Sequence, residues 1–133
     1  MARALAQAEI ALFAGEVPVG CVDVRNNIVV AEAHNTTNRD RDPLSHAEIN
    51  VLEQLGGDTE GVDFYITLEP CAMCAGILER AGIPVYFGSH NEVFGGRKLL
   101  GRAYGHFLDD SRAVDILQRF YSLGNTVEKR NVL

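Results

Sequence analysis

Residues 62–82 read VDFYITLEPCAMCAGILERAG, and this stretch decides the fold class. It opens with an apolar run containing β-branched and aromatic residues, which predicts a buried strand over 62–68. Pro70 follows at a position suited to a helix start, and we expect a helix over 71–81. A second apolar run predicts another buried strand over 83–87. Two strands joined through a helix are expected to pair in parallel within one sheet.

The residues before this stretch predict a helix followed by a hairpin. Apolar residues at helical spacing indicate a helix over 2–13. The apolar runs 16–24 and 28–33 are typical of paired strands. Asn26 and Asn27 lie between them, and because asparagine tolerates positive φ, this pair suits a two-residue hairpin turn.

A polar segment over 35–45 leads from the hairpin into a further helix over 46–55. Ser45 is expected to be the N-cap residue of that helix. Glu48, at the third helical position, would then complete a capping box.

The C-terminal third predicts a loop, a last helix and a tail. Residues 88–105 contain five glycines and are typical of a loop. Apolar residues recur at helical spacing over 111–123 and predict an amphipathic helix, and residues 124–133 form a short polar tail. The order of elements predicts one α/β domain over 1–133, a mixed sheet with helices on both faces.

Composition narrows the classes of function. The chain has a formal net charge of -6 and a sequence pI near 5.1, which is unusual for a domain that binds nucleic acid by bulk electrostatics. Three cysteines, two of them at CxxC spacing, argue against a secreted disulfide scaffold. They favour an intracellular location, cytoplasmic and/or nuclear. Because no apolar run reaches the length of a membrane span, we expect no membrane partner.

Three residues have the chemistry of a zinc site: His46, Cys71 and Cys74. The two cysteines are three residues apart, so on a helix they face the same way. Two thiolates and an imidazole make a set of three protein ligands, and catalytic zinc keeps its fourth position for water. We therefore expect one catalytic Zn2+. Cys21 lies in an apolar run and is expected in the core, not as a fourth ligand.

Glu48 is expected to transfer protons and not to bind the metal. A carboxylate two residues beyond His46 can accept a proton from water and return it to a leaving amine. The order HxE followed by PCxxC is the known signature of zinc-dependent nucleobase deaminases. Taken singly, His46 fits a packed side chain, and CxxC fits a structural or redox site.

At these residues the chain resembles the cytidine deaminase-like superfamily and, within it, the tRNA adenosine deaminases. The resemblance covers most of the chain, and its motifs are residues 15–20, Asn35, and residues 46–48, 67–76, 91–96 and 113–121. The last two segments are similar to the catalytic subunit of the eukaryotic heterodimeric enzymes. The resemblance implies a three-layer α/β/α fold around a mixed five-stranded sheet, with the fifth strand compressed into about 105–108. It also implies hydrolysis of adenosine to inosine at the tRNA wobble position, with Glu48 as the proton shuttle.

The resemblance further implies which residues contact substrate. Around the flipped base these are Val17, Pro18, Asn35, Ala47 and Pro70. Contacts to RNA are implied for basic residues of the glycine-rich segment and the tail, whose other interpretation is solvated surface charge: Arg97, Lys98, Arg102, Lys129 and Arg130. Because the chain is acidic, we expect a second, pseudocatalytic subunit to supply most of the affinity for the tRNA anticodon arm. The expected assembly is a heterodimer, or otherwise a homodimer.

Two other functions fit parts of the sequence. A free-base or nucleoside deaminase acting on cytosine, cytidine or guanine would need the same zinc ligands, because pocket shape and flanking contacts select the substrate. A non-catalytic, zinc-binding partner subunit would have no need of Glu48, so the presence of this carboxylate favours an enzyme.

Overall fold

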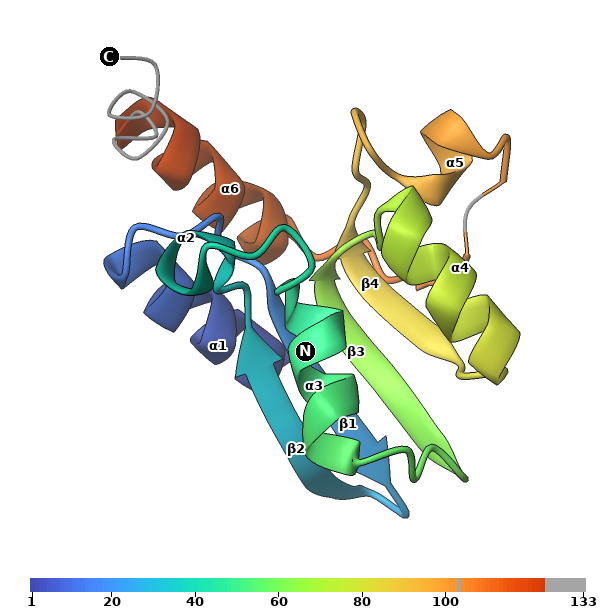
Figure 1. The fold of residues 1–133 in the computed structure, drawn as a ribbon. Helices are drawn as coiled ribbons and strands as arrows, with labels where there is room; N and C mark the ends of the chain where they lie inside the picture. Colours follow the sequence, from blue (N-terminus) through green and yellow to red (C-terminus); the bar gives the residue numbers. More distant parts are fainter. Residues whose placement is uncertain (103, 124–133) are drawn as a thin grey trace.

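A five-stranded mixed sheet lies at the centre of the computed structural model, which describes residues 1–102 and 104–123 (Figure 1). The strands are β1 Gly20–Arg25, β2 Ile28–His34, β3 Val62–Leu68, β4 Val85–Ser89 and β5 His106–Phe107. Their order in the sheet is β2-β1-β3-β4-β5. β1 runs antiparallel to both of its neighbours, whereas β3, β4 and β5 are parallel. The mixed five-stranded sheet and its compressed last strand are confirmed.

Helices cover both faces of the sheet and complete three layers. On one face lie α1 Ala2–Phe13 and α6 Ser111–Leu123, and on the other lie α3 Ala47–Leu55 and α4 Ala72–Ala81 (Figure 1). Two short helices, α2 Thr37–Asp40 and α5 Gly96–Leu99, occupy connecting segments. The expected three-layer α/β/α fold is confirmed. No helix in the two described ranges is both long enough and apolar enough to cross a membrane.

The main core lies between the sheet and the layer of α3 and α4. Phe64, Ile66 and Phe87 contribute to it from the sheet, Val51 from α3 and Leu78 from α4. Each of these side chains is at most 1% exposed. Because both helices pack on the same face of the sheet, the core fixes where their N-termini lie relative to each other. Cys21, which was expected in the core, is buried in this cluster.

Two local features follow directly from residue type. Asn26 and Asn27 have φ of 52° and 62°, the left-handed conformation that the predicted hairpin turn needs. At Gly20 a Cβ atom would lie 1.9 Å from the carbonyl oxygen of Ala4. Only glycine therefore lets α1 approach β1 this closely.

The start of α3 differs from the sequence prediction. Its N-cap residue is His46, and not Ser45. The capping box assigned to Ser45 and Glu48 is therefore wrong. Glu48 is buried and lines a cavity, so its side chain lies in the interior and does not cap the helix.

Other boundaries also moved. The first strand begins at Gly20, and the buried side chain of Glu16 instead accepts hydrogen bonds from the backbone of α2. The strand expected over 83–87 runs instead from Val85 to Ser89. The segments 35–45 and 88–105, expected as loops, each contain a four-residue helix, α2 in the first and α5 in the second. The tail expected over 124–133 lies outside the described residues.

Candidate active site

The N-termini of α3 and α4 bring three metal-ligating side chains together. His46 is the N-cap residue of α3, Cys71 is that of α4, and Cys74 lies in the first turn of α4. The Nδ1 atom of His46 is 3.5 Å from the Sγ atom of Cys71 and 3.5 Å from that of Cys74. All three ligand atoms lie within 4.8 Å of one another.

These distances fit a tetrahedral zinc ion. Zinc binds sulfur at about 2.3 Å and imidazole nitrogen at about 2.0 to 2.1 Å, so tetrahedral angles place the two ligand atoms about 3.5 to 3.6 Å apart. One imidazole and two thiols are also ligand types that zinc prefers. The residues present therefore suit the ion in both spacing and chemistry.

The two sulfur atoms compete for one proton. A hydrogen bond from the Cys74 thiol, helped by one from His46 and one from the Cys74 backbone N–H, lowers the pKa of Cys71 to about 4. The same hydrogen bond raises the pKa of the Cys74 thiol, and a separate hydrogen bond with Cys71 raises that of His46. His46, Cys71 and Cys74 would hold a divalent cation with both thiols deprotonated, which would end this competition.

Glu48 lies two residues beyond His46 in the first turn of α3 and is 4% exposed. Burial is the main reason that the pKa of Glu48 is raised to about 7. The charge on the Cys71 sulfur adds to this increase, and the charge on His46 opposes it. A carboxyl group in this position can both accept and release a proton beside the three ligand atoms.

A cavity of about 560 Å³ lies over these residues, within the usual size range of small-molecule sites. Of the five residues expected to contact the base, Val17, Asn35 and Ala47 line this cavity, together with His46, Glu48 and Cys71. Pro18 and Pro70 are buried next to lining residues but do not line the cavity themselves.

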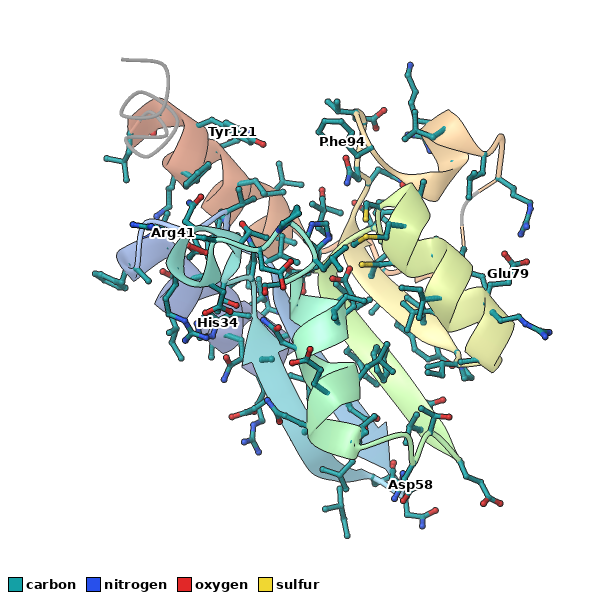
Figure 2. The ribbon with its side chains drawn as sticks, in the orientation of Figure 1. His34, Arg41, Asp58, Glu79, Phe94 and Tyr121 are labelled. Atoms are coloured by element: carbon teal, nitrogen blue, oxygen red, sulfur yellow. The ribbon has the colours of Figure 1, made fainter. Side chains whose placement is uncertain are left out.

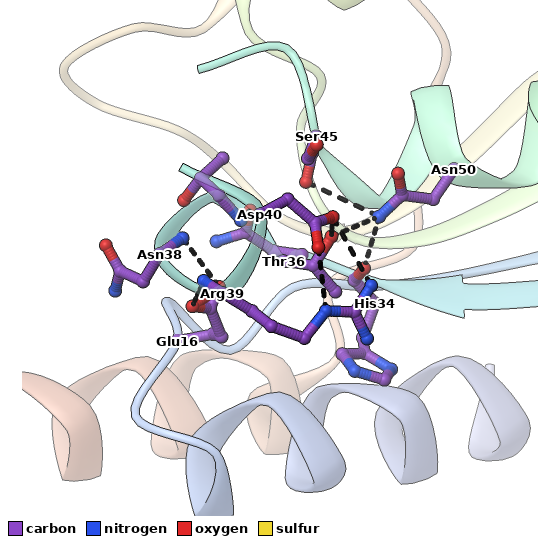
Figure 3. Close-up of polar contacts among 10 residues, drawn as sticks. Glu16, His34, Thr36, Asn38, Arg39, Asp40, Ser45 and Asn50 are labelled. Atoms are coloured by element: carbon purple, nitrogen blue, oxygen red, sulfur yellow. Dashed lines mark hydrogen bonds and ion pairs between the residues drawn. The ribbon is translucent and has the colours of Figure 1, made fainter. Parts of the chain in front are cut away.

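The side-chain amide of Asn35 is held on both sides. Its Nδ2 donates to the carbonyl oxygen of Val17 at 3.3 Å, and its Oδ1 accepts from the backbone N–H of Thr37 at 3.3 Å. The segment that follows is fixed by polar contacts, in which Glu16 accepts from two backbone N–H groups of α2 (Figure 3). Asn50 of α3 adds a hydrogen bond to the hydroxyl of Thr36 at 2.9 Å.

The basic residues expected to contact RNA differ in whether an acidic side chain pairs with them. Arg97 pairs with Glu92 at 2.8 Å and Arg102 with Glu79 at 2.6 Å, so nearby acids offset both guanidinium charges. Lys98 is exposed on α5. The remaining two candidates, Lys129 and Arg130, lie outside the described residues.

Comparisons with known proteins identify the family. Residues 1–89 match the model of the cytidine and deoxycytidylate deaminase zinc-binding region. The chain belongs to this deaminase family. The matched residues include His46, Cys71 and Cys74, so the zinc-binding region of this deaminase contains the cluster described above.

Two relatives and one solved structure refine this relationship. The tRNA-specific adenosine deaminase 2 of Xenopus tropicalis is 34% identical over 94% of this deaminase and 88% of that protein. The tRNA(Ile)-lysidine synthase of Thermus thermophilus is 46% identical over 91 residues, but the deaminase spans only 18% of the synthase's length. A structure from biochemical and structural studies of A-to-I editing by tRNA:A34 deaminases at the wobble position of transfer RNA has a TM-score of 0.75 and 32% identity. That match covers 86% of this chain and 95% of the other.

Sequence reasoning assigned no role to several residues that line the deaminase's cavity. Phe94 is 63% exposed and Tyr121 is 68% exposed, and both line the cavity. Figure 2 shows Phe94 on the loop before α5 and Tyr121 on α6. Asn91 and Glu69 also line the cavity. The sequence offered one signal for these two aromatic residues. Phe94 lies in the motif segment 91–96 and Tyr121 in the motif segment 113–121.

Proposed function

We propose that this chain is a zinc-dependent hydrolase that converts adenosine to inosine at the wobble position of tRNA. One arrangement carries the proposal: the buried carboxyl group of Glu48 lies beside the His46, Cys71 and Cys74 cluster in a cavity that can admit a base. Similarity to a tRNA-specific adenosine deaminase over 94% of the chain supports tRNA as the substrate.

The chain's own residues account for the chemistry. His46, Cys71 and Cys74 would hold zinc, which when bound supplies a Lewis acid and a water molecule that loses a proton readily. Glu48 accepts a proton from the attacking water and delivers it to the amine that leaves C6 of adenine as ammonia. The Asn35 amide, oriented by its neighbours, can form hydrogen bonds to a purine edge.

The assembly we propose contains a second, pseudocatalytic subunit that supplies most of the affinity for the tRNA anticodon arm. The net charge of -6 supports this division, since RNA affinity depends on neutralising phosphates. The ion pairs of Arg97 and Arg102 support it as well. The free thiols of the metal cluster support an intracellular location, in the cytoplasm, the nucleus or both.

Glu48→Gln tests the proposed chemistry, because it preserves the side-chain volume and removes the proton acceptor. We expect one zinc per chain, an unchanged fold, and turnover of an anticodon stem-loop reduced by about 100- to 10,000-fold. Glu53→Gln is the matched control, since it neutralises an exposed carboxylate on the same helix. Wild-type turnover by the Glu48 variant would overturn the assignment.

Two further measurements test substrate and assembly. Free adenosine, guanine and cytosine, assayed beside the stem-loop, separate a tRNA enzyme from a free-base or nucleoside deaminase. The mass of the native complex separates a heterodimer from a homodimer. Tight tRNA binding by this chain alone would contradict the proposed division between subunits.

A further inference from the structure

Glu69 is a buried carboxylate beside the metal-binding turn, residues 70–72, which carries Cys71. Neither the proposed metal binding nor the proposed proton transfer requires Glu69. It lies between β3 and α4 and is 1% exposed. Its Oε1 accepts hydrogen bonds from His90 Nδ1 at 3.1 Å and from the backbone N–H of Asn91 at 3.3 Å. Its Oε2 accepts from the backbone N–H of Arg97 at 3.0 Å. One side chain thus holds both ends of the segment 90–97.

The same segment is joined through its backbone to the start of α4. The N–H of Ala72 donates to the carbonyl oxygen of Phe94 at 2.9 Å, and the N–H of Gly96 donates to that of Pro70 at 3.3 Å. These two hydrogen bonds lie on either side of Cys71 in the sequence. The segment 90–97 is therefore attached directly to the turn that provides a metal ligand.

The position of Gly95 shows how closely the segment fits around Glu69. A Cβ atom on Gly95 would lie 2.6 Å from Oε2 of Glu69 and 2.5 Å from the carbonyl oxygen of Asn91. The φ of Gly95 is -63°, so lack of space, and not backbone conformation, requires glycine here.

We infer that Glu69 is a positioning residue, whose buried carboxylate folds residues 90–97 against the metal-binding turn and so shapes one wall of the substrate cavity. Asn91, Val93 and Phe94, all in this segment, line the cavity. Glu69 also borders the cavity, but both of its oxygen atoms are engaged by the segment. The inference rests on the proposed function for the identity of the substrate.

Glu69→Gln tests this role, because it keeps the side-chain size and replaces one acceptor oxygen by a donor. We expect the KM for an anticodon stem-loop to rise about ten-fold while kcat stays within about two-fold, since the change loosens binding and leaves the proton transfer intact. Zinc should remain at one per chain. Amide hydrogen exchange over residues 91–97, measured without substrate, should become at least about ten-fold faster.

Gly95→Ala provides a second route to the same displacement and leaves Glu69 unchanged, so it decides the matter if Glu69→Gln does not fold. We expect the same rise in KM, with zinc retained. Gly76→Ala on α4 is the control, because its Cβ would meet nothing within 4 Å. Glu92→Gln controls the exchange measurement, because Glu92 is an exposed carboxylate on the same segment.

Three results would overturn the inference: unchanged exchange over 91–97, faster exchange with unchanged KM, or loss of zinc from Glu69→Gln. The last would assign Glu69 to the metal site. A native complex of the wild-type chain with its second subunit that holds zinc but deaminates no RNA would refute the proposed function. The exchange data would still decide whether Glu69 holds the segment.

Discussion

The buried carboxylate of Glu16 accepts a hydrogen bond from the backbone N–H of Arg39 at 3.0 Å. Its second oxygen accepts from the N–H of Asn38 at 3.1 Å. Glu16 therefore acts as the N-terminal cap of α2 from outside the helix. Because Val17 follows Glu16 and Asn35 precedes α2, this contact keeps two cavity-lining segments together.

We expect Glu16→Gln to lower the free energy of unfolding by about 1 to 3 kcal/mol, because a buried N–H loses its charged acceptor. Urea denaturation followed by circular dichroism measures the change. Glu9→Gln is the control, since Glu9 forms an exposed pair with Arg119 and should matter by less than about 1 kcal/mol. Equal losses in the two variants would show that the buried contact has no special role.

Asp23 of β1 should make stability depend on pH. Both of its carboxylate oxygens are buried and have no hydrogen-bond partner within the described part of the chain. Burial raises the pKa of Asp23 from 3.8 to about 6, with Asp63 and Asp58 adding to the increase and Arg25 opposing it. Well below pH 3.8 the group is protonated in both states, so it adds no pH dependence. As pH rises from about 4 to 6, the unfolded state ionises first, so stability is lost.

Asp23→Asn stays neutral throughout this range and provides the comparison. Relative to this variant, we expect the natural chain to lose about 1 to 2 kcal/mol of unfolding free energy between pH 4 and pH 7. Paired denaturation curves across that range measure the difference. A difference that does not change with pH would contradict the prediction.

Gly20→Ala and Gly76→Ala should have opposite effects on stability. At Gly20 the new methyl group would lie 1.9 Å from the Ala4 carbonyl oxygen, so α1 must move and stability should fall by about 3 kcal/mol. At Gly76, in the interior of α4, the methyl group meets nothing, and stability should rise by about 0.5 to 1 kcal/mol. Thermal melts of both variants check the two signs. A Gly20 variant as stable as the natural chain would disprove the close approach.

Cys71→Ser and Cys21→Ala separate the metal ligands from the core cysteine. We expect Cys71→Ser to lose at least about 100-fold in zinc affinity and to lose turnover, because one of three protein ligands is weakened. Cys21→Ala should keep one zinc per chain, since Cys21 lies in the apolar core. Elemental analysis after dialysis against a chelator measures both. Retention of zinc by the serine variant would exclude Cys71 as a ligand.

The parts of the fold set by local sequence pattern could be predicted. The strand over 62–68 and the helices over 2–13 and 111–123 have the expected bounds, because apolar periodicity within each segment matches the face it buries. Prediction of the metal cluster depended on residue type and spacing. The structure places His46 within hydrogen-bonding distance of both cysteines.

The parts set by distant contacts could not be predicted. An isolated helix of four residues is unstable, yet α2 and α5 form because Glu16 and Glu69 accept from backbone N–H groups in their first turns. Each acceptor lies more than twenty positions from its donor, so no local pattern reveals the pairing. The expected capping box is absent because α3 is capped at His46, which places Glu48 at the second helical position with its side chain lining the cavity.

The three candidate metal ligands all lie within residues 46–74, whereas the donors that surround Glu69 come from residues 90–97. Translation proceeds from the N-terminus, so the ribosome releases the complete ligand set before the segment that narrows the cavity. A nascent chain paused after α4 already contains all three candidate ligand side chains. The cavity wall is completed later, by Asn91, Val93 and Phe94 and then by Tyr121 of α6.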